Sequence, residues 1–206
     1  MLHLRRQDFD DLEHVYRINM MNSCSGFKSA NLIGTKSNDG TANVAVFSSV
    51  THLGSNPPLL GIVFRPVSDV PRNTYENIKE TGQFTVNHIH LDIIEQAHHT
   101  SAKYDKSISE FDITKLEEEY KNDWHAPFVK GAPIQMALTF CEEYIIKANN
   151  TVQVIAEIKD LYIQDDIVEA DGFVDLAKAN VVAINGLDGY ALPALKQRIE
   201  YQRPKK

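Results

Sequence analysis

Two long stretches in the second half of the chain constrain its fold most strongly. Residues 136–148 and 151–164 are rich in β-branched and aromatic side chains, and only Asn149-Asn150 separates them. Asparagine tolerates the left-handed backbone of a tight turn, so this pattern predicts an antiparallel hairpin. The hairpin is unusually long, because strands in globular proteins typically have about 5–6 residues. Its length exceeds what a small barrel needs for itself.

Shorter strands are predicted in the first half of the chain. Residues 29–35 are followed by the turn Ser37–Gly40, where Asp-Gly suits a hairpin, and then by a strand over residues 42–51. After the turn-rich residues 54–58, residues 59–64 form a buried strand. Helices are inserted without regular alternation and no GxGxxG motif is present, so the expected fold is mainly β, an antiparallel barrel with peripheral helices.

Helical periodicity occurs in four segments. Apolar residues of 8–21 fall on one face, and we expect this helix to pack across the barrel. A helix that begins at Asn73 is predicted to end before Gly82, which is typical of a C-terminal cap. Residues 91–99 have apolar positions at helical spacing, and residues 113–120 are predicted to form another short helix.

Composition excludes several classes of protein. With 206 residues, of which 43% are hydrophobic and 24% charged, the chain is most simply one domain covering residues 1–206. The formal charge of −7 and the scattered basic residues argue against a nucleic-acid partner. No apolar run approaches the roughly 18 residues of a membrane span, and the start lacks a signal-like apolar segment. We therefore expect a cytoplasmic protein without a membrane partner.

Cysteine and histidine residues give no strong metal signature. Cys24 and Cys141 are too few for a disulfide framework, and we expect both to be reduced and buried. His88 and His90 would lie on one face of a strand, which leaves a zinc site as a minor alternative. No cysteine pairs with these histidines and no HExxH helix is present, so we expect no metal.

The start of the predicted helix at Asn73 suits an anion. Unpaired backbone N–H groups and the positive end of the helix dipole point at such a ligand, and Arg72 can hold two oxygens at once. An alternative interpretation is that Asn73 and Glu76 form a capping box and that the arginine is a solvated surface charge.

Hydroxyl groups at a neighbouring strand end favour the anion site. Ser48, Ser49 and Thr51 close the strand over residues 42–51, and Arg65 follows the strand over residues 59–64. Hydroxyls and arginine therefore converge at adjacent strand ends. The residues themselves therefore indicate a β-barrel with a phosphate site.

Four segments, in this order and spacing, resemble the flavin reductase-like family of FMN-binding split barrels: Asn43–Ser49, Asn56–Leu60, Arg72–Ile78 and Thr81–Asn87. The likeness runs from about Gly26 to Tyr190. It implies a split β-barrel in which FMN lies at the interface of a homodimer. It also implies NAD(P)H-dependent flavin reduction, with NADH or NADPH as the electron donor, or flavin-linked electron transfer. A partner monooxygenase would be one consumer of the reduced flavin.

Carried over residue by residue, the resemblance assigns a cofactor site. The positions implied near the ribityl-phosphate chain are Asn43, Ser48, Ser49 and Thr51, and those implied at the phosphate are Arg72, Asn73 and Thr74. Arg65 either joins the phosphate site or pairs with Asp69 at the surface. Ser101 and Tyr104 belong to a loop similar to the family segment that approaches the flavin ring, although Tyr104 as a core residue is an alternative.

One departure from the family bears on catalysis. Many reductases of this family carry Gly-Asp-His at the tip of the long hairpin, with the histidine close to flavin and nicotinamide, whereas this chain has Asn149-Asn150-Thr151. The catalytic residue is therefore unidentified, although His52 or His99 could take over the role. A non-catalytic FMN-binding or flavin-sensing module is the main alternative function. A third is a split barrel that holds haem, with His52, His88 or His90 as the iron ligand, or a pyridoxal-type phosphate.

Overall fold

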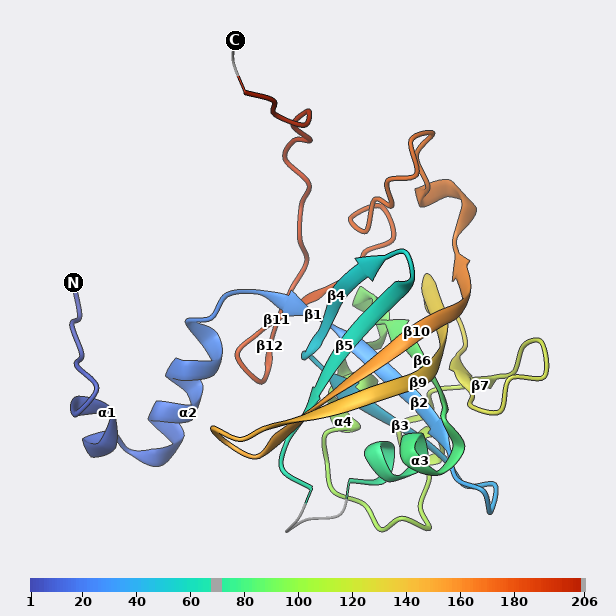
Figure 1. Cartoon of the computed structure of the whole chain (residues 1–206), viewed down its shortest axis with the longest axis horizontal. Coiled ribbons are helices and arrows are strands. Elements are labelled where there is room, and N and C mark those ends of the chain that lie inside the picture. Colours follow the sequence, from blue (N-terminus) through green and yellow to red (C-terminus); the bar gives the residue numbers. More distant parts are fainter. Residues whose placement is uncertain (68–71, 205–206) are drawn as a thin grey trace.

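The computed structural model describes residues 1–67 and 72–204. It is mainly β, and its largest element is a seven-stranded antiparallel sheet in the order β3-β2-β6-β9-β10-β5-β4 (Figure 1). The strands are β2 (Asn31–Lys36), β3 (Ala42–Phe47), β4 (Val50–Ser55), β5 (Pro58–Phe64), β6 (Gln83–His88), β9 (Ile134–Ile146) and β10 (Thr151–Ile163).

Both predicted hairpins are present. Strands β9 and β10 pair along their whole length, from Thr151 opposite Ile146 to Ile163 opposite Ile134. Asn150 has a φ of 58°, the left-handed conformation that the turn requires. The β2–β3 hairpin turns at Gly40, whose φ is 97°. The two strongest turn signals in the sequence therefore place β3 beside β2 and β10 beside β9 in the sheet.

The sheet curls so that its two ends approach each other. The ring of Phe47, at the end of β3, packs edge-on against Phe64 of β5 with centroids 5.1 Å apart. The Ser29 hydroxyl donates to the Val50 carbonyl at 2.9 Å, and the Val63 N–H donates to the Ser49 carbonyl at 3.4 Å. The Phe47–Phe64 contact and the Ser29 bond bring residues of β3 and the segment before β2 against β5 and β4, at the other side of the sheet order, which is the arrangement of a split barrel. The Val63–Ser49 bond extends the pairing of the neighbouring strands β5 and β4.

Shorter elements surround this sheet. Helix α3 (Asn73–Thr81) lies against β2 and β3, and η1 (Leu91–Ile93), α4 (Ile94–His99) and η2 (Asp165–Ile167) follow later in the chain. A second sheet contains β1 (Lys28–Ser29), β11 (Ala183–Asn185) and β12 (Gly189–Ala191), and β7 (Glu118–Glu119) pairs with β8 (Phe128–Val129). Among the described residues, no helix is long and apolar enough to cross a membrane.

Two apolar clusters form the core. The larger lies inside the curled sheet and includes fully buried Ile33, Ile62 and Phe84, with Ile78 of α3 closing one end. The smaller lies on the outer face of β2 and β3, under α4 and α5 (Glu110–Thr114). Alternate residues of the same strands thus face two different cores, which explains why these strands are largely apolar on both faces.

The N-terminal segment differs from its prediction. It forms two helices, α1 (Asp8–Asp11) and α2 (His14–Ser23), and neither contains a buried residue. Figure 1 shows both helices to one side of the sheet, so the expectation that they pack across the barrel is wrong. Val15 is 57% exposed and Tyr16 is 51% exposed. No side chain of the apolar face that the periodicity indicated is fully buried in the described part of the chain.

Three other predictions are also corrected. The strand expected over residues 42–51 is broken at Ser48, because β3 ends at Phe47 and β4 begins at Val50. The helix expected over residues 113–120 is α5 instead, which ends where Lys115 takes a left-handed φ of 63°. Both cysteines are exposed: Cys24 follows the unpacked α2, and Cys141 lies where β9 extends beyond the core.

Candidate functional site

Helix α3 begins without a side-chain cap. Arg72 occupies the N-cap position with φ −126° and ψ 90°, and no side chain makes a capping hydrogen bond at the helix start. The first intrahelical bond joins the Glu76 N–H to the Arg72 carbonyl at 2.9 Å. The capping box that was the alternative interpretation of Asn73 and Glu76 is not formed. Arg72 occupies the N-cap position in place of Asn73, and Glu76 pairs with Lys106 at 3.3 Å. The N–H groups of the first turn thus lack the side-chain partner that a capping box would supply.

The side chain of Arg72 has a hydrogen-bond donor that is not in use among the described residues. Its side chain is half-buried, and its Nε atom is buried without a hydrogen-bond partner among the described residues. A buried N–H group without a partner costs about 1–3 kcal/mol relative to a satisfied one. Arg65, in contrast, is exposed, and its proposed partner Asp69 lies outside the described residues. Arg72 is therefore the better-placed donor for an anion.

Three aromatic rings connect the helix start to the strand ends that carry the serines. Phe47 contacts Phe64, and Phe64 contacts Tyr75 in the first turn of α3 with centroids 5.5 Å apart. Ser48 follows Phe47 directly, so the packing brings the β3 end, the β5 end and the α3 start into one region. Ser48 and Ser49 are half-buried. The Ser49 hydroxyl donates to the Val63 carbonyl at 2.7 Å, while Thr51 is exposed within β4.

Glu143 of β9 contacts two side chains of α3. Tyr75 donates to its carboxylate at 2.9 Å, and Lys79 lies 3.1 Å from the same group. Burial, together with the bond to Glu143, raises the pKa of Tyr75 to about 12, so this phenol stays a donor at neutral pH. The long hairpin therefore helps to orient the helix whose start forms the candidate site.

A buried polar cluster lies beneath the same helix start. Asn43 of β3 is 6% exposed and lies 3.1 Å from the hydroxyl of Thr74, which is also 6% exposed. Two of the predicted site residues are thus brought into direct contact. The other members of the cluster were not predicted from the sequence: Thr35, Asn77 and Glu110.

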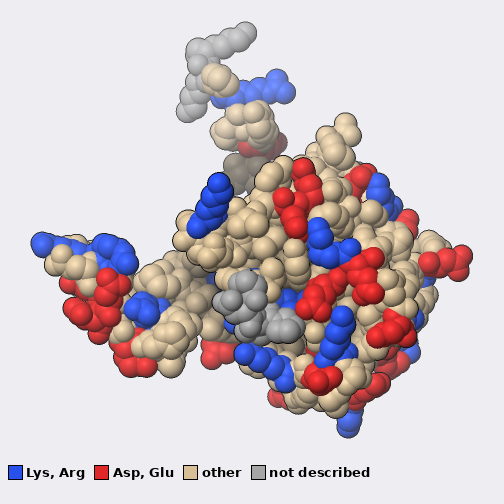
Figure 2. Space-filling model, turned by 60° about the horizontal axis from the view of Figure 1, so that its bottom comes forward, with Lys and Arg blue, Asp and Glu red and all other residues tan. Residues whose placement is uncertain are grey.

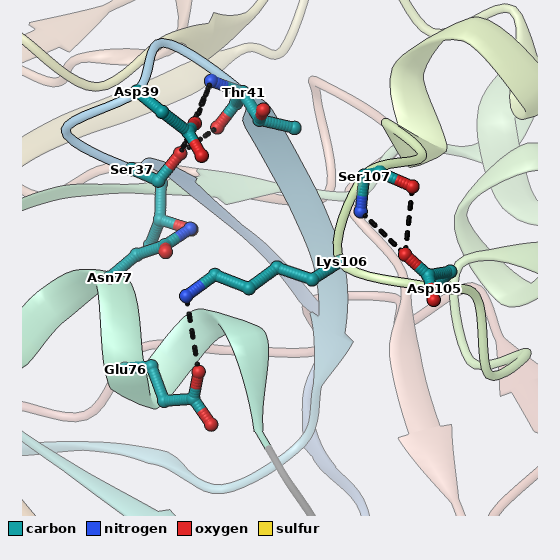
Figure 3. Close-up of polar contacts among 9 residues, drawn as sticks. Ser37, Asp39, Thr41, Glu76, Asn77, Asp105, Lys106 and Ser107 are labelled. Carbon is teal, nitrogen blue, oxygen red and sulfur yellow. Dashed lines mark hydrogen bonds and ion pairs between the residues drawn. The ribbon is translucent and has the colours of Figure 1, made fainter.

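The loop that was predicted to approach the flavin ring is attached to α3. Figure 3 shows Lys106 reaching from this loop to Glu76, and Asp105 accepting bonds from the backbone and hydroxyl of Ser107. Those bonds hold the pKa of Asp105 below its usual value. Tyr104 is half-buried, and its hydroxyl lies 2.7 Å from Nε2 of His99. Ser101 is exposed.

Charge is mixed on the molecular surface. Figure 2 shows Lys and Arg side chains interspersed with Asp and Glu side chains on the face that is turned forward. Affinity for an anion must therefore come from local donors, because no broad field of one sign covers this face. Two surface hollows, one lined by Lys36 and residues 120–125 and the other by Asp171 and residues 198–201, contain none of the predicted site residues.

The hairpin tip and two of the histidines were also candidates for a functional role. The Thr151 hydroxyl donates to the Asn149 side-chain oxygen at 2.8 Å, so it stabilises the turn. Burial lowers the pKa of His88 to about 4, and its Nδ1 has no partner among the described residues. His90 lies 3.7 Å from Asp92. Within residues 1–67 and 72–204, no three side chains of His, Cys, Asp or Glu are grouped as metal ligands.

Comparison with known proteins identifies the family. A solved candidate flavin reductase with a split barrel domain, from Shewanella frigidimarina NCIMB 400, is 46% identical to this chain. The match covers 98% of this chain and 100% of that chain, with a TM-score of 0.94. Nitrilotriacetate monooxygenase component B from Bacillus cereus shares the fold at 17% identity, covering 97% of this chain and 98% of that chain with a TM-score of 0.82.

A further structure has the same fold. An FMN-binding protein from Thermus thermophilus is 13% identical, covers 86% of this chain and 93% of that chain, and has a TM-score of 0.72. The model of the flavin reductase like domain matches residues 25–180. Since this match spans most of the sequence, the chain belongs to the flavin reductase-like family and has its split-barrel fold.

Proposed function

We propose that the protein binds FMN with the flavin phosphate at the start of α3. The observation that carries the proposal is Arg72, a half-buried arginine at an uncapped helix start whose buried Nε has no partner among the described residues. A phosphate would satisfy this group and the first-turn N–H groups together. Asn73, Thr74 and Ser48 would supply the remaining contacts, as the family resemblance implies. The FMN-binding protein with the same fold supports the choice of cofactor.

The proposed activity is transfer of a hydride from NADH or NADPH to FMN, or transfer of electrons through bound FMN. Flavin supplies the redox chemistry, while the chain orients the flavin and excludes water from it. Tyr104, in the loop that Lys106 attaches to α3, is proposed to contact the flavin ring, with Ser101 beside it. The similarity in fold to component B of a monooxygenase supports a role in supplying reduced flavin to a partner monooxygenase.

A non-catalytic FMN-binding or flavin-sensing role is the second candidate, and the hairpin tip favours it. Thr151 takes the position at which many family reductases have histidine, and its hydroxyl is already bonded to Asn149. Stopped-flow mixing of the FMN-loaded protein with NADH or NADPH separates the two candidates. Reduction within seconds by either nucleotide supports the reductase, whereas no reduction over minutes by both supports the binding module.

We also propose that the functional unit is a homodimer with flavin between subunits. Large apolar side chains are exposed on two projecting segments, Val15 and Tyr16 on α2 and Tyr144 and Ile145 near the hairpin tip. Such side chains are typical of surfaces that a partner covers. Light scattering at micromolar concentration should give twice the chain mass. A monomer that still carries FMN would refute this arrangement.

A further inference from the structure

Five polar side chains from four elements meet under the start of α3, and each is at most 6% exposed. They are Thr35 of β2, Asn43 of β3, Thr74 and Asn77 of α3, and Glu110 of α5. Only Glu110 carries a titratable group. Buried polar groups of this kind are normally hydrogen-bonded, so the direction of each bond is constrained by its neighbours. Among the five described side chains, Asn77 Oδ1 is the buried atom without a partner.

The Asn43 amide can lie in this cluster in two orientations. In the first, its nitrogen donates to Glu110 Oε2 at 3.2 Å, and its oxygen accepts from the hydroxyls of Thr74 at 3.1 Å and Thr35 at 3.3 Å. The Val44 N–H donates to the same Glu110 oxygen at 3.3 Å. This orientation requires Glu110 to be an acceptor, and it is therefore the arrangement of the ionised carboxylate.

In the second orientation, the Asn43 nitrogen donates to Thr74 at 3.1 Å and to Thr35 at 3.3 Å. The amide oxygen then faces Glu110 Oε2, and two oxygens at that separation require a proton between them. A protonated Glu110 supplies it. This orientation changes the role of the Thr74 hydroxyl. The hydroxyl now accepts a hydrogen bond from Asn43, so its own proton is available to another acceptor.

The surroundings of Glu110 are neutral. Its polar contacts among the described residues are the Asn43 amide, the Val44 backbone N–H and its own backbone N–H, and the buried Nε of Arg72 has no partner there. The nearby titratable groups on α3 and α4 contact other residues: Glu76 pairs with Lys106, His98 contacts Tyr190, and His99 contacts Tyr104. Burial raises the pKa of the Glu110 carboxyl above its usual value.

We propose that Glu110 is a positioning residue whose protonation turns the Asn43 amide and frees the Thr74 hydroxyl to donate to a phosphate at the start of α3. This inference rests on the proposed FMN site. Protonation also removes a buried negative charge from beneath the bound dianion. Both effects favour binding to the protonated form, so FMN binding is coupled to proton uptake by Glu110.

The sign of the coupling gives a measurable pH dependence. Bound phosphate raises the pKa of Glu110 further, so the affinity for FMN is highest below the pKa of the free protein and falls as pH rises. A single coupled proton limits this decrease to tenfold in Kd per pH unit. The second phosphate ionisation, with a pKa near 6, gives the ligand its own pH dependence, which a variant without Glu110 retains.

Calorimetric titration of the full chain with FMN, in buffers of different ionisation enthalpy, counts the protons taken up. Glu110→Gln should imitate the protonated form, because its amide donates to the Asn43 oxygen. We expect wild type to take up as much as one proton more per site than Glu110→Gln, and the variant to bind FMN more tightly at high pH. Asp112→Asn, an exposed change on the same helix, is the matched control and should behave as wild type.

Thr74→Val provides a second test if Glu110→Gln fails to fold by circular dichroism. It keeps the carboxyl but removes the responding hydroxyl, so its excess proton uptake should decrease relative to wild type. Equal uptake by wild type and Glu110→Gln would overturn the coupling. Equal uptake by wild type and Thr74→Val would overturn the proposed release of the Thr74 hydroxyl, because only the charge of Glu110 would then be coupled to binding. No FMN binding to wild type and Asp112→Asn would refute the proposed function itself, and the coupling with it.

Discussion

Replacement of Arg72 by alanine should weaken FMN binding far more than riboflavin binding. The arginine is half-buried at an uncapped helix start, and its Nε is without a partner in the described part of the chain. A hydrogen bond to a charged group in such surroundings contributes about 1.5–3 kcal/mol, compared with about 0–1 kcal/mol for an exposed ion pair. We therefore expect the Kd for FMN to increase about 10- to 150-fold.

The assay is isothermal titration calorimetry of wild type and variant with FMN and with riboflavin, which lacks the phosphate. Arg198→Ala is the matched control, because Arg198 is exposed and pairs with Asp171 near the C-terminal tail. This control should leave both affinities unchanged. Arg72→Lys should recover only part of the loss, since lysine restores the charge without the planar guanidinium. A change of less than about twofold for FMN, or an equal loss for riboflavin, would refute the assignment of Arg72.

Three further outcomes follow from other parts of the structure. Thr151→His should increase the rate of flavin reduction by NADH or NADPH in stopped-flow experiments by about tenfold or more, and an unchanged rate would exclude the hairpin tip from catalysis. Gly34→Ala should destabilise the fold by more than about 2 kcal/mol in thermal unfolding, because its Cβ would lie 2.2 Å from the Pro127 carbonyl oxygen; unaltered stability would contradict this packing. His88 binds a proton more readily when unfolded, so the free energy of unfolding should fall by about 2 kcal/mol between pH 7 and pH 5, and His88→Gln should remove this decrease. The same pH dependence in that variant would show that His88 is not its source.

The sheet was largely predictable because its signals are local. Asn149-Asn150 and Gly40 mark turns whose backbone conformations few other residues adopt, and the strands beside them pair as expected. The helix that begins at Asn73 was equally predictable, because Gly82 caps its C-terminal end in the left-handed conformation. Each of these features depends on residues that are neighbours in the sequence.

The errors arise where distant contacts decide the outcome. Periodicity identified an apolar face on residues 8–21 but could not say whether this chain supplies the surface that covers it. The Glu110 carboxylate accepts a bond from the Val44 backbone N–H, and these residues are 66 positions apart in the sequence. The burial of Glu110 could not be predicted, because acidic residues in polar segments are usually exposed. Thr74 and Asn77 did carry a usable signal, because their spacing places them on the same helix face as the core residue Ile78.

The preference for FMN over riboflavin tests the central proposal most directly. Calorimetric titration of the wild-type chain with both ligands, under one set of buffer and salt conditions, measures the contribution of the phosphate site alone. With Arg72 and the first-turn N–H groups of α3 as donors, FMN should bind at least tenfold more tightly. Equal affinities for FMN and riboflavin would contradict a phosphate site at the start of α3.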